Sequence, residues 1–261
     1  MISLAIDREP IEGGMMTTEV NVRTVDPATP VGQIAAAAPA TTRIFERWKI
    51  DYCCGGGLAL EKACERAGAP LDQVLVALEE VLGVPGERNW SEAPLAELSA
   101  HIVETHHRYT REELELLSAL SAKVEGVHGE NHPEMREVAR IVRQLHPELF
   151  QHMMKEEQIL FPYVADLENA VKTGQKAPLP FFGTVENPIR MMIAEHDQAA
   201  EMLGQLRTAT RNYDLPGDAC NSYRALYHRL QELERDLHLH IHKENNIYFP
   251  RALDLEQKTF A

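Results

Sequence analysis

Two distant segments of the chain repeat one another, and this repeat constrains the fold more than any other feature of the sequence. Residues 152–168 read HMMKEEQILFPYVADLE, and residues 240–256 read HIHKENNIYFPRALDLE. Both contain a histidine, a glutamate four positions later, a Phe-Pro step and a final Asp-Leu-Glu. A histidine and a carboxylate one helical turn apart are ligands for a transition metal. The repeat therefore predicts a pseudo-twofold helical bundle that holds two metal ions.

Each repeat is preceded by another histidine at a matching distance. His107 lies 45 residues before His152, and His196 lies 44 residues before His240. Four amphipathic segments carry an apolar stripe in steps of three and four, and each stripe passes through polar residues where a bundle otherwise places leucine. These in-phase polar residues are His107, His152, Glu156, His196, His240 and Glu244.

Several polar neighbours compete with these residues or fall outside the stripes. His106 is the rival of His107, but aligning the first segment with the third favours His107, because Leu114 and Leu117 then correspond to leucines of the third segment. Glu157 follows the in-phase glutamate and lies out of phase, so replacing it by alanine is expected to be nearly silent.

The free-energy cost of burying these six polar side chains in the bundle core must be offset. Burying charged groups without partners costs several kcal/mol each, against a total stability of about 5–15 kcal/mol. Two metal ions remove the conflict, because they bind the groups that would otherwise destabilise the core. The six residues divide into two sets of three, with Glu156 and Glu244 as bridges and two histidines on each ion. Mixed imidazole and carboxylate ligation fits redox iron or manganese, and no thiolate is in phase to favour a structural zinc site.

Length, charge and cysteine content limit the class of protein. A chain of 261 residues allows one large domain or two smaller ones. The formal net charge of −14 argues against a duplex nucleic acid or an anionic membrane as partner. No apolar run approaches the ~20 residues that span a bilayer, and the acidic N-terminus does not resemble a secretory signal. Four cysteines without paired spacing predict a reducing, cytoplasmic location.

The pattern of helices, turns and linkers predicts four parts. The long amphipathic segments are separated near residues 126–132, 168–188 and 213–218. In the N-terminal unit two helices are expected to end at Gly68 and Gly83. The predicted parts are a flexible tail (1–18), a small helical unit (19–84), a linker (85–94) and a four-helix bundle (95–256).

The ligand-bearing segments resemble a known family. HIVETHHRY, HMMKEEQILFP, EHD and HKENNIYFPRAL are similar to the hemerythrin-like domain of the Repair of Iron Centers family, the di-iron proteins of iron–sulfur cluster repair. IDYCCGGG, with VGQIAAAAPATTRIFE before it and LEKAC after it, resembles the small cysteine domain fused to that bundle. The resemblance covers residues 20–256. It implies an all-α fold: a hemerythrin-like four-helix bundle with a small N-terminal helical cysteine domain.

The resemblance also implies a cofactor. It assigns the six in-phase residues to a non-haem di-iron centre, two Fe ions bridged by Glu156, Glu244 and an oxo or hydroxo group. The pattern departs from oxygen-carrying hemerythrins, which have a fifth histidine and different spacings.

Cys53 and Cys54 are adjacent and are followed by Gly55–Gly57. Neighbouring cysteines rarely form a disulfide with each other, because the ring is strained. One interpretation is a tight turn with small buried side chains. The preferred one is a reactive or transiently metal-binding dithiol, exposed by the glycines at the start of the next helix, where a thiolate is stabilised. The resemblance implies a redox or nitrosylation-related role. Cys64 is expected in the core, and Cys220 has no visible partner.

Three functions are compatible with these features. The resemblance favours a stress-response protein that repairs iron–sulfur clusters damaged by oxidants or nitric oxide, as an iron source. The alternatives are an enzyme that reduces nitric oxide to nitrous oxide at the di-iron centre, and a sensor or carrier of oxygen or nitric oxide. Whether the protein is an enzyme stays open, as does a homodimer. The expected partners are damaged iron–sulfur proteins or cluster-assembly proteins, with nitric oxide or oxygen as small ligands.

Overall fold

The structure is a computed structural model that describes residues 25–82, 88–177 and 179–260. Within these residues all regular elements are helices, and the one β-type pairing is an isolated bridge between Pro30 and Ala59. The predicted all-α class is therefore confirmed. The predicted tail (1–18) and the predicted helix end at Gly83 lie outside the described residues.

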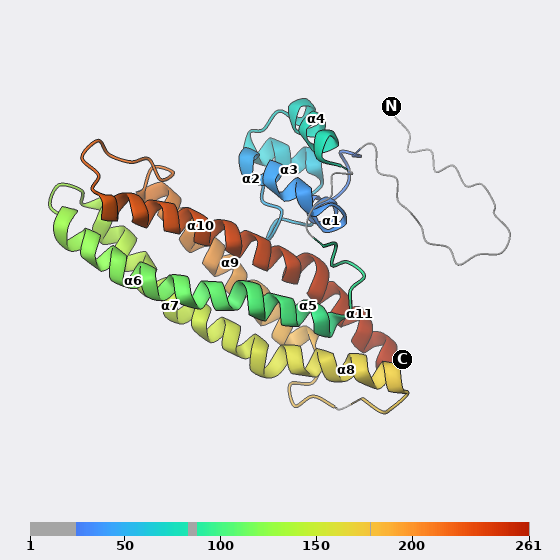
Figure 1. The fold of residues 1–261 in the computed structure, drawn as a ribbon. Coiled ribbons are helices and arrows are strands. Elements are labelled where there is room, and N and C mark those ends of the chain that lie inside the picture. Colours follow the sequence, from blue (N-terminus) through green and yellow to red (C-terminus); the bar gives the residue numbers. More distant parts are fainter. Residues whose placement is uncertain (1–24, 83–87, 178, 261) are drawn as a thin grey trace.

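The larger part of the molecule consists of four long helices that run side by side (Figure 1). Three of them are interrupted by a five-residue π-helical turn, whereas the third is regular. In chain order the elements are α5 (Leu95–Ile102), a π turn (Val103–His107) and α6 (Arg108–His128); α7 (Glu134–Lys155), a π turn (Glu156–Leu160) and α8 (Phe161–Thr173); α9 (Glu186–Ala209); and α10 (Asn221–Lys243), a π turn (Glu244–Tyr248) and α11 (Phe249–Phe260).

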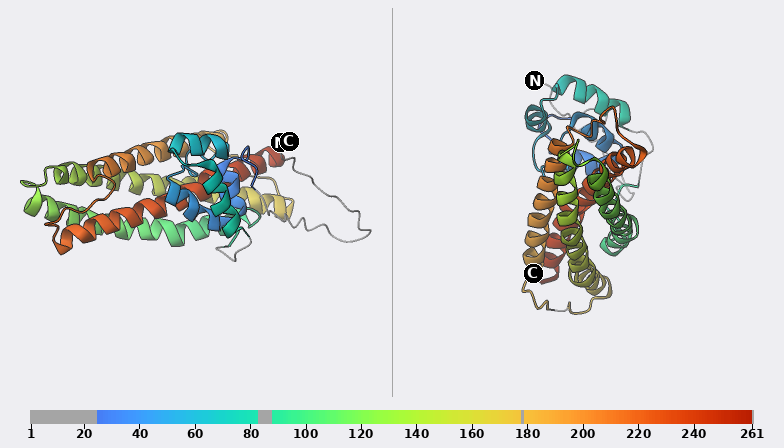
Figure 2. Two further views of the ribbon diagram at one scale, coloured as in Figure 1. Left: turned by 90° about the horizontal axis from the view of Figure 1, so that it is seen from above. Right: turned by 90° about the vertical axis from the view of Figure 1, so that its left-hand side faces the viewer.

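Four short helices form a separate small core at the N-terminal side. They are α1 (Val31–Ala37), α2 (Thr42–Trp48), α3 (Leu60–Ala67) and α4 (Leu71–Val81), with a 3-10 turn (Pro39–Thr41) between the first two. Helix α3 ends as predicted at Gly68, whose φ of 68° suits a residue without a side chain. Figure 1 and the right-hand view of Figure 2 show these helices on one flank of the bundle, and a contact between His238 and Glu46 joins α10 to α2.

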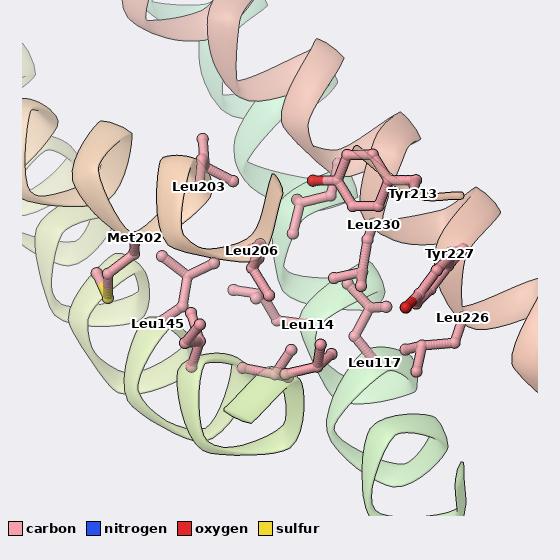
Figure 3. Close-up of a cluster of buried hydrophobic side chains, with 14 of the residues drawn as sticks. Leu114, Leu117, Leu145, Met202, Leu203, Leu206, Tyr213, Leu226, Tyr227 and Leu230 are labelled. Atoms are coloured by element: carbon pink, nitrogen blue, oxygen red, sulfur yellow. The ribbon is translucent and has the colours of Figure 1, made fainter. Parts of the chain in front are cut away.

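The bundle core is divided along its length into two apolar clusters. One fills the end near the α6–α7 turn, where Leu114 and Leu117 lie among leucines of α7, α9 and α10 (Figure 3). The other fills the opposite end around Ile102, Phe161 and Tyr248. Along each helix the predicted ligands lie where one cluster gives way to the other, so the apolar clusters flank the polar site on both sides.

Of the three connections, the one between α8 and α9 differs most from its predicted limits. The second helix continues to Thr173 and ends at Gly174, whose φ is 66°. The crossing from α8 to α9 is therefore shorter than the 168–188 segment predicted from its glycines and prolines, because residues 168–173 add more than a turn to the helix. None of the described helices is both long and apolar enough to cross a bilayer.

Candidate metal centre

The π-helical turns mark the centre of the bundle. One ends at His107, and the other two begin at Glu156 and Glu244. The Phe-Pro step of the repeat explains the last two: Pro162 and Pro250 lack an N–H and crowd the carbonyl four residues earlier, which a wider turn relieves. Such π bulges are frequent at functional sites, because they redirect side chains out of the regular helical phase.

The structure brings all six predicted ligands together. Two groups of four residues have ligand atoms that lie within 4.8 Å of one another, and both groups contain the two glutamates. All six side chains are buried. The first group is His107, His240, Glu156 and Glu244, and the second is His152, His196, Glu156 and Glu244. His106 belongs to neither group.

The histidines converge in pairs through their Nε2 atoms. The Nε2 atoms of His107 and His240 lie 3.1 Å apart, and those of His152 and His196 lie 3.0 Å apart. Metal–imidazole bonds are ~2.0–2.1 Å long, so two nitrogens that bind one ion at a right angle are about 3 Å apart. The spacing of each pair therefore fits two ligands of a single ion.

Each glutamate reaches both histidine pairs. Glu156 Oε2 lies 3.3 Å from His107 Nε2 and 3.4 Å from His152 Nε2. The two oxygens of Glu244 lie 3.0 and 3.2 Å from the Nε2 atoms of the other two histidines. This arrangement is what two bridging carboxylates require.

The donor set fits a pair of cations. Both oxygens of Glu156 and Oε2 of Glu244 are buried without a hydrogen bond from any described residue. Burial opposes a charged imidazole at His107, but the neighbouring glutamates outweigh it and raise the pKa of His107 to about 10. By the same balance, with Glu244 as the main partner, the pKa of His196 rises to about 9. The pocket thus attracts positive charge to the place where the six ligands converge.

The outer nitrogens of three histidines are held by hydrogen bonds. A partner at Nδ1 fixes the ring and leaves Nε2 free for a metal, and such partners matter about 10- to 100-fold in affinity. The pairs are His107 with Glu157 (2.7 Å), His152 with Glu195 (2.9 Å), and His196 with Asn245 (2.9 Å).

The expectation that a Glu157 substitution is nearly silent is therefore wrong. Its carboxylate lies out of phase with the core but in contact with His107 Nδ1 and with Arg111. The repeat held a signal for this role, because Glu157 and Asn245 each directly follow one of the two glutamates that lie near both histidine pairs.

The fourth ring, His240, has a different surrounding. Its Nδ1 is buried without a hydrogen-bond partner among the described residues. The ring of His106 stacks on it at 5.4 Å. His106 itself contacts Asp236 through Nδ1 and Lys243 through Nε2, both at 2.9 Å. Burial, followed by the charge of Lys243, lowers the pKa of His106 to about 3.

The cysteine loop lies against the bundle, but not as predicted. Cys53 is buried and Cys54 is partly exposed, and helix α3 begins only at Leu60, so neither thiol lies at a helix N-terminus. The expected stabilisation of a thiolate there is wrong. A hydrogen bond with Cys54, followed by burial, raises the pKa of Cys53 well above its usual value. Among the described residues the four cysteines form no disulfide.

The other two cysteines differ in their surroundings. Cys64 is buried in the small core, as expected. Cys220, which precedes α10, has a partner that the sequence did not reveal, since its Sγ lies 3.1 Å from His128 Nε2. The backbone N–H of Tyr223 and the His128 ring lower the pKa of this exposed thiol.

An open groove of about 450 Å³ lies on the bundle surface between α5 and α8. Small side chains such as Ala96, Ala100 and Ala165 line it, together with Glu157 and Phe161. The Phe161 ring stacks on His107 at 5.9 Å. Two residues that contact a candidate ligand are therefore accessible from this groove.

Comparison with known proteins identifies the family. Residues 98–252 match the model of the hemerythrin HHE cation binding domain. The chain belongs to the hemerythrin family. Residues 27–82 match a second family model, ScdA_N, described as a domain of unknown function. Relatives from Escherichia coli O81 (strain ED1a) and Escherichia fergusonii, both called iron-sulfur cluster repair protein YtfE, are 37% identical over 224 residues, which is 86% of this chain and 96% of theirs. The resemblance inferred from the motifs is confirmed.

Proposed function

We propose that the six convergent residues hold two iron ions. His107 and His240 would bind one ion and His152 and His196 the other, with Glu156 and Glu244 shared between them. The spacing of the Nε2 pairs and the unpaired carboxylate oxygens support two ions rather than one. Bound iron would supply redox chemistry and an exchangeable metal, while the protein orients the imidazoles and excludes water from the carboxylates.

The function that the site supports best is repair of damaged iron–sulfur clusters. The single observation that carries this proposal is the buried four-histidine, two-glutamate site in a chain that covers nearly the whole length of relatives named for such repair. Four neutral ligands and only two carboxylates bind iron less tightly than the carboxylate-rich ferritin-like sites, which favours release of iron to a client. The names of the relatives favour repair over nitric oxide reduction and over gas carriage.

The finer parts of the proposal concern the dithiol and the partners. Cys54 is partly exposed beside the metal centre, which supports a redox or nitrosylation-related role for Cys53 and Cys54. Clients would be iron–sulfur proteins damaged under oxidative or nitrosative stress in the cytoplasm. The groove beside Phe161 offers a route for a small ligand such as nitric oxide or oxygen. We place the domain boundaries at residues 19–84 and 95–256, with a linker between them.

A reactivation assay tests this function. Anaerobically purified protein with bound iron should restore activity to an enzyme whose [4Fe–4S] cluster has been damaged by nitric oxide. Glu156→Ala, which removes a bridge, should lose both iron and repair. Cys53→Ser with Cys54→Ser should retain two irons but lose repair, because these thiols lie outside the ligand groups.

Three outcomes would count against the proposal. Wild-type protein that binds iron and fails to restore the client would remove the repair function. Full repair by Glu156→Ala would separate repair from the metal centre. Full repair by the double serine variant would reduce the cysteine loop to a structural turn.

A further inference from the structure

The residue that follows each bridging glutamate differs between the two halves of the repeat. Glu157 accepts a hydrogen bond from His107 Nδ1 and from Arg111. Asn245, at the equivalent place, accepts from His196 Nδ1 at 2.9 Å and turns its amide N–H towards the carbonyl oxygen of Cys53 at 3.5 Å. An amide can accept from a ring and donate to a carbonyl, whereas a carboxylate can only accept. The difference in residue type therefore follows from what each side chain faces.

The next residue fixes the cysteine loop in this position. Asn246 Nδ2 donates to the carbonyl oxygens of Tyr52 at 3.2 Å and Cys53 at 3.1 Å. Its side-chain oxygen lies so close to Gly32 and Gly56 that a β-carbon on either residue would collide with it. The second glycine of the CCGGG motif is thus required by the Asn246 amide. The Asn246 amide thus anchors the cysteine loop to the middle of the last π turn.

The same loop reaches one half of the metal centre. Cys54 Sγ lies 4.0 Å from the carbonyl oxygen of His196. The loop therefore meets His196 at two points: Asn245 contacts its ring and the Cys53 carbonyl, and Cys54 Sγ lies near its main-chain oxygen. Among the described residues, Nδ1 of His107 has Glu157 as its partner instead, and not a residue that contacts the cysteine loop.

We propose that Asn245 is a positioning residue that couples the cysteine loop to the half-site of His152 and His196. Through one side chain it holds the His196 ring in the tautomer that binds metal and keeps the Cys53 carbonyl in place, while Asn246 carries the main anchorage. The coupling is reciprocal, as any linkage between two sites must be. A change at the thiols alters one ion of the pair and leaves the His107 half-site unchanged. This inference rests on the proposed metal centre.

The test separates the two hydrogen bonds of Asn245. Full-length protein purified anaerobically with its iron is treated with iodoacetamide, and alkylation of the peptide that contains Cys53 and Cys54 is measured by mass spectrometry, with the exposed Cys220 as internal reference. Asn245→Ala should accelerate loop alkylation about two-fold, the factor of a weak hydrogen bond, because its amide lies 3.5 Å from the Cys53 carbonyl. It should also lower the affinity for one of the two iron ions by about 10- to 100-fold, as measured by chelator competition. Asn245→Asp should keep the iron, because it still accepts from the ring, but should show the faster alkylation.

Glu157→Ala is the matched control, because it removes the equivalent partner in the other half of the repeat. It should weaken one iron without changing the alkylation of the cysteine loop. The coupling would be overturned if Glu157→Ala accelerated alkylation of the cysteine loop as much as Asn245→Ala does, or if Asn245→Ala left the alkylation rate unchanged. If Asn245→Ala loses its helical circular dichroism, Asn245→Asp decides: faster alkylation with retained iron supports the coupling, and an unchanged rate overturns it. Wild-type protein without iron would overturn the proposed function instead.

Discussion

Removal of iron should destabilise the bundle by an amount that the structure bounds. Three buried carboxylate oxygens of Glu156 and Glu244 accept no hydrogen bond from the described residues. Each unsatisfied buried group costs ~1–3 kcal/mol. In the iron-free protein the protonated rings of His107 and His196 lie beside these carboxylates and offset part of the cost, so we take the lower bound of ~3 kcal/mol for the three oxygens. This is a large share of the ~5–15 kcal/mol that a folded domain has in total. At ~2–4 °C per kcal/mol for a domain of this size, the lower bound corresponds to a fall in Tm of ~6–12 °C.

The dependence of stability on iron concentration would also count the ions. An ion that binds only the folded protein stabilises it by ~1.4 kcal/mol for each tenfold rise in free iron above its Kd. Two ions double this slope to ~2.8 kcal/mol. Urea unfolding followed by circular dichroism, under anaerobic conditions and at buffered Fe(II) concentrations, measures the slope directly.

The outcome distinguishes three descriptions of the centre. A slope near ~2.8 kcal/mol per tenfold supports two ions that share the glutamates. A slope near ~1.4 kcal/mol per tenfold would indicate a site that binds a single ion. No dependence on iron, with a Tm change below ~2 °C after chelation, would refute the claim that the unpaired carboxylates are metal ligands.

Three further predictions follow from the ligand geometry. Glu156→Ala and Glu244→Ala should each lower iron content and weaken the magnetic coupling between the irons, as measured by metal analysis and Mössbauer spectroscopy. His107→Ala should weaken iron binding at least ~10-fold, whereas His106→Ala should weaken it less than the ~10-fold of a hydrogen-bonded outer partner, because His106 stacks on His240 without a hydrogen bond to it; loss from His106→Ala alone would reverse the assignment. Iron affinity should rise as pH increases from about 6 to about 9, because iron must displace protons from His107 and His196, whose pKa values are raised to about 10 and about 9; a flat pH profile in chelator competition would contradict this.

The sequence predicted the fold and the convergence of the ligands for one reason. Periodicity of three and four fixes which side chains face the core of a bundle, and polar residues at such positions are rare enough to be informative. His107 was distinguished from His106 by aligning the apolar positions of the first segment with those of the third, and of these two histidines the structure brings only His107 into a ligand group. The internal repeat added the pseudo-twofold relation, which placed the two glutamates as shared ligands.

Periodicity could not predict the contacts around the ligands. A π turn adds a residue to the helix and changes the phase behind it, so Glu157 and Asn245 face histidines of neighbouring helices despite lying off the apolar stripe. The position of the cysteine loop depends on contacts between residues almost two hundred positions apart, such as Asn246 with Cys53. No local pattern contains that information. The glycines were interpreted as exposing the thiols, whereas Gly56 makes room for an asparagine.

The two halves of the repeat have the same ligands but different supports, and this difference predicts which iron leaves first. On one side Glu195 holds His152 Nδ1 and also pairs with Lys155. His106 occupies the position equivalent to Glu195 and contacts Lys243, the equivalent of Lys155.

A second imidazole in that place stacks on His240 and leaves its Nδ1 without a hydrogen bond from the described residues. A hydrogen-bond acceptor at that nitrogen raises the metal affinity of a histidine site by about 10- to 100-fold. The iron at His107 and His240 should therefore be the more weakly bound of the two. Chelation should then proceed in two phases. His106→Glu, which places a carboxylate where Glu195 stands in the other half, should slow the fast phase and leave the slow one unchanged. If the variant slows only the second phase, or if both irons leave together at one rate, the supports do not determine the order of release.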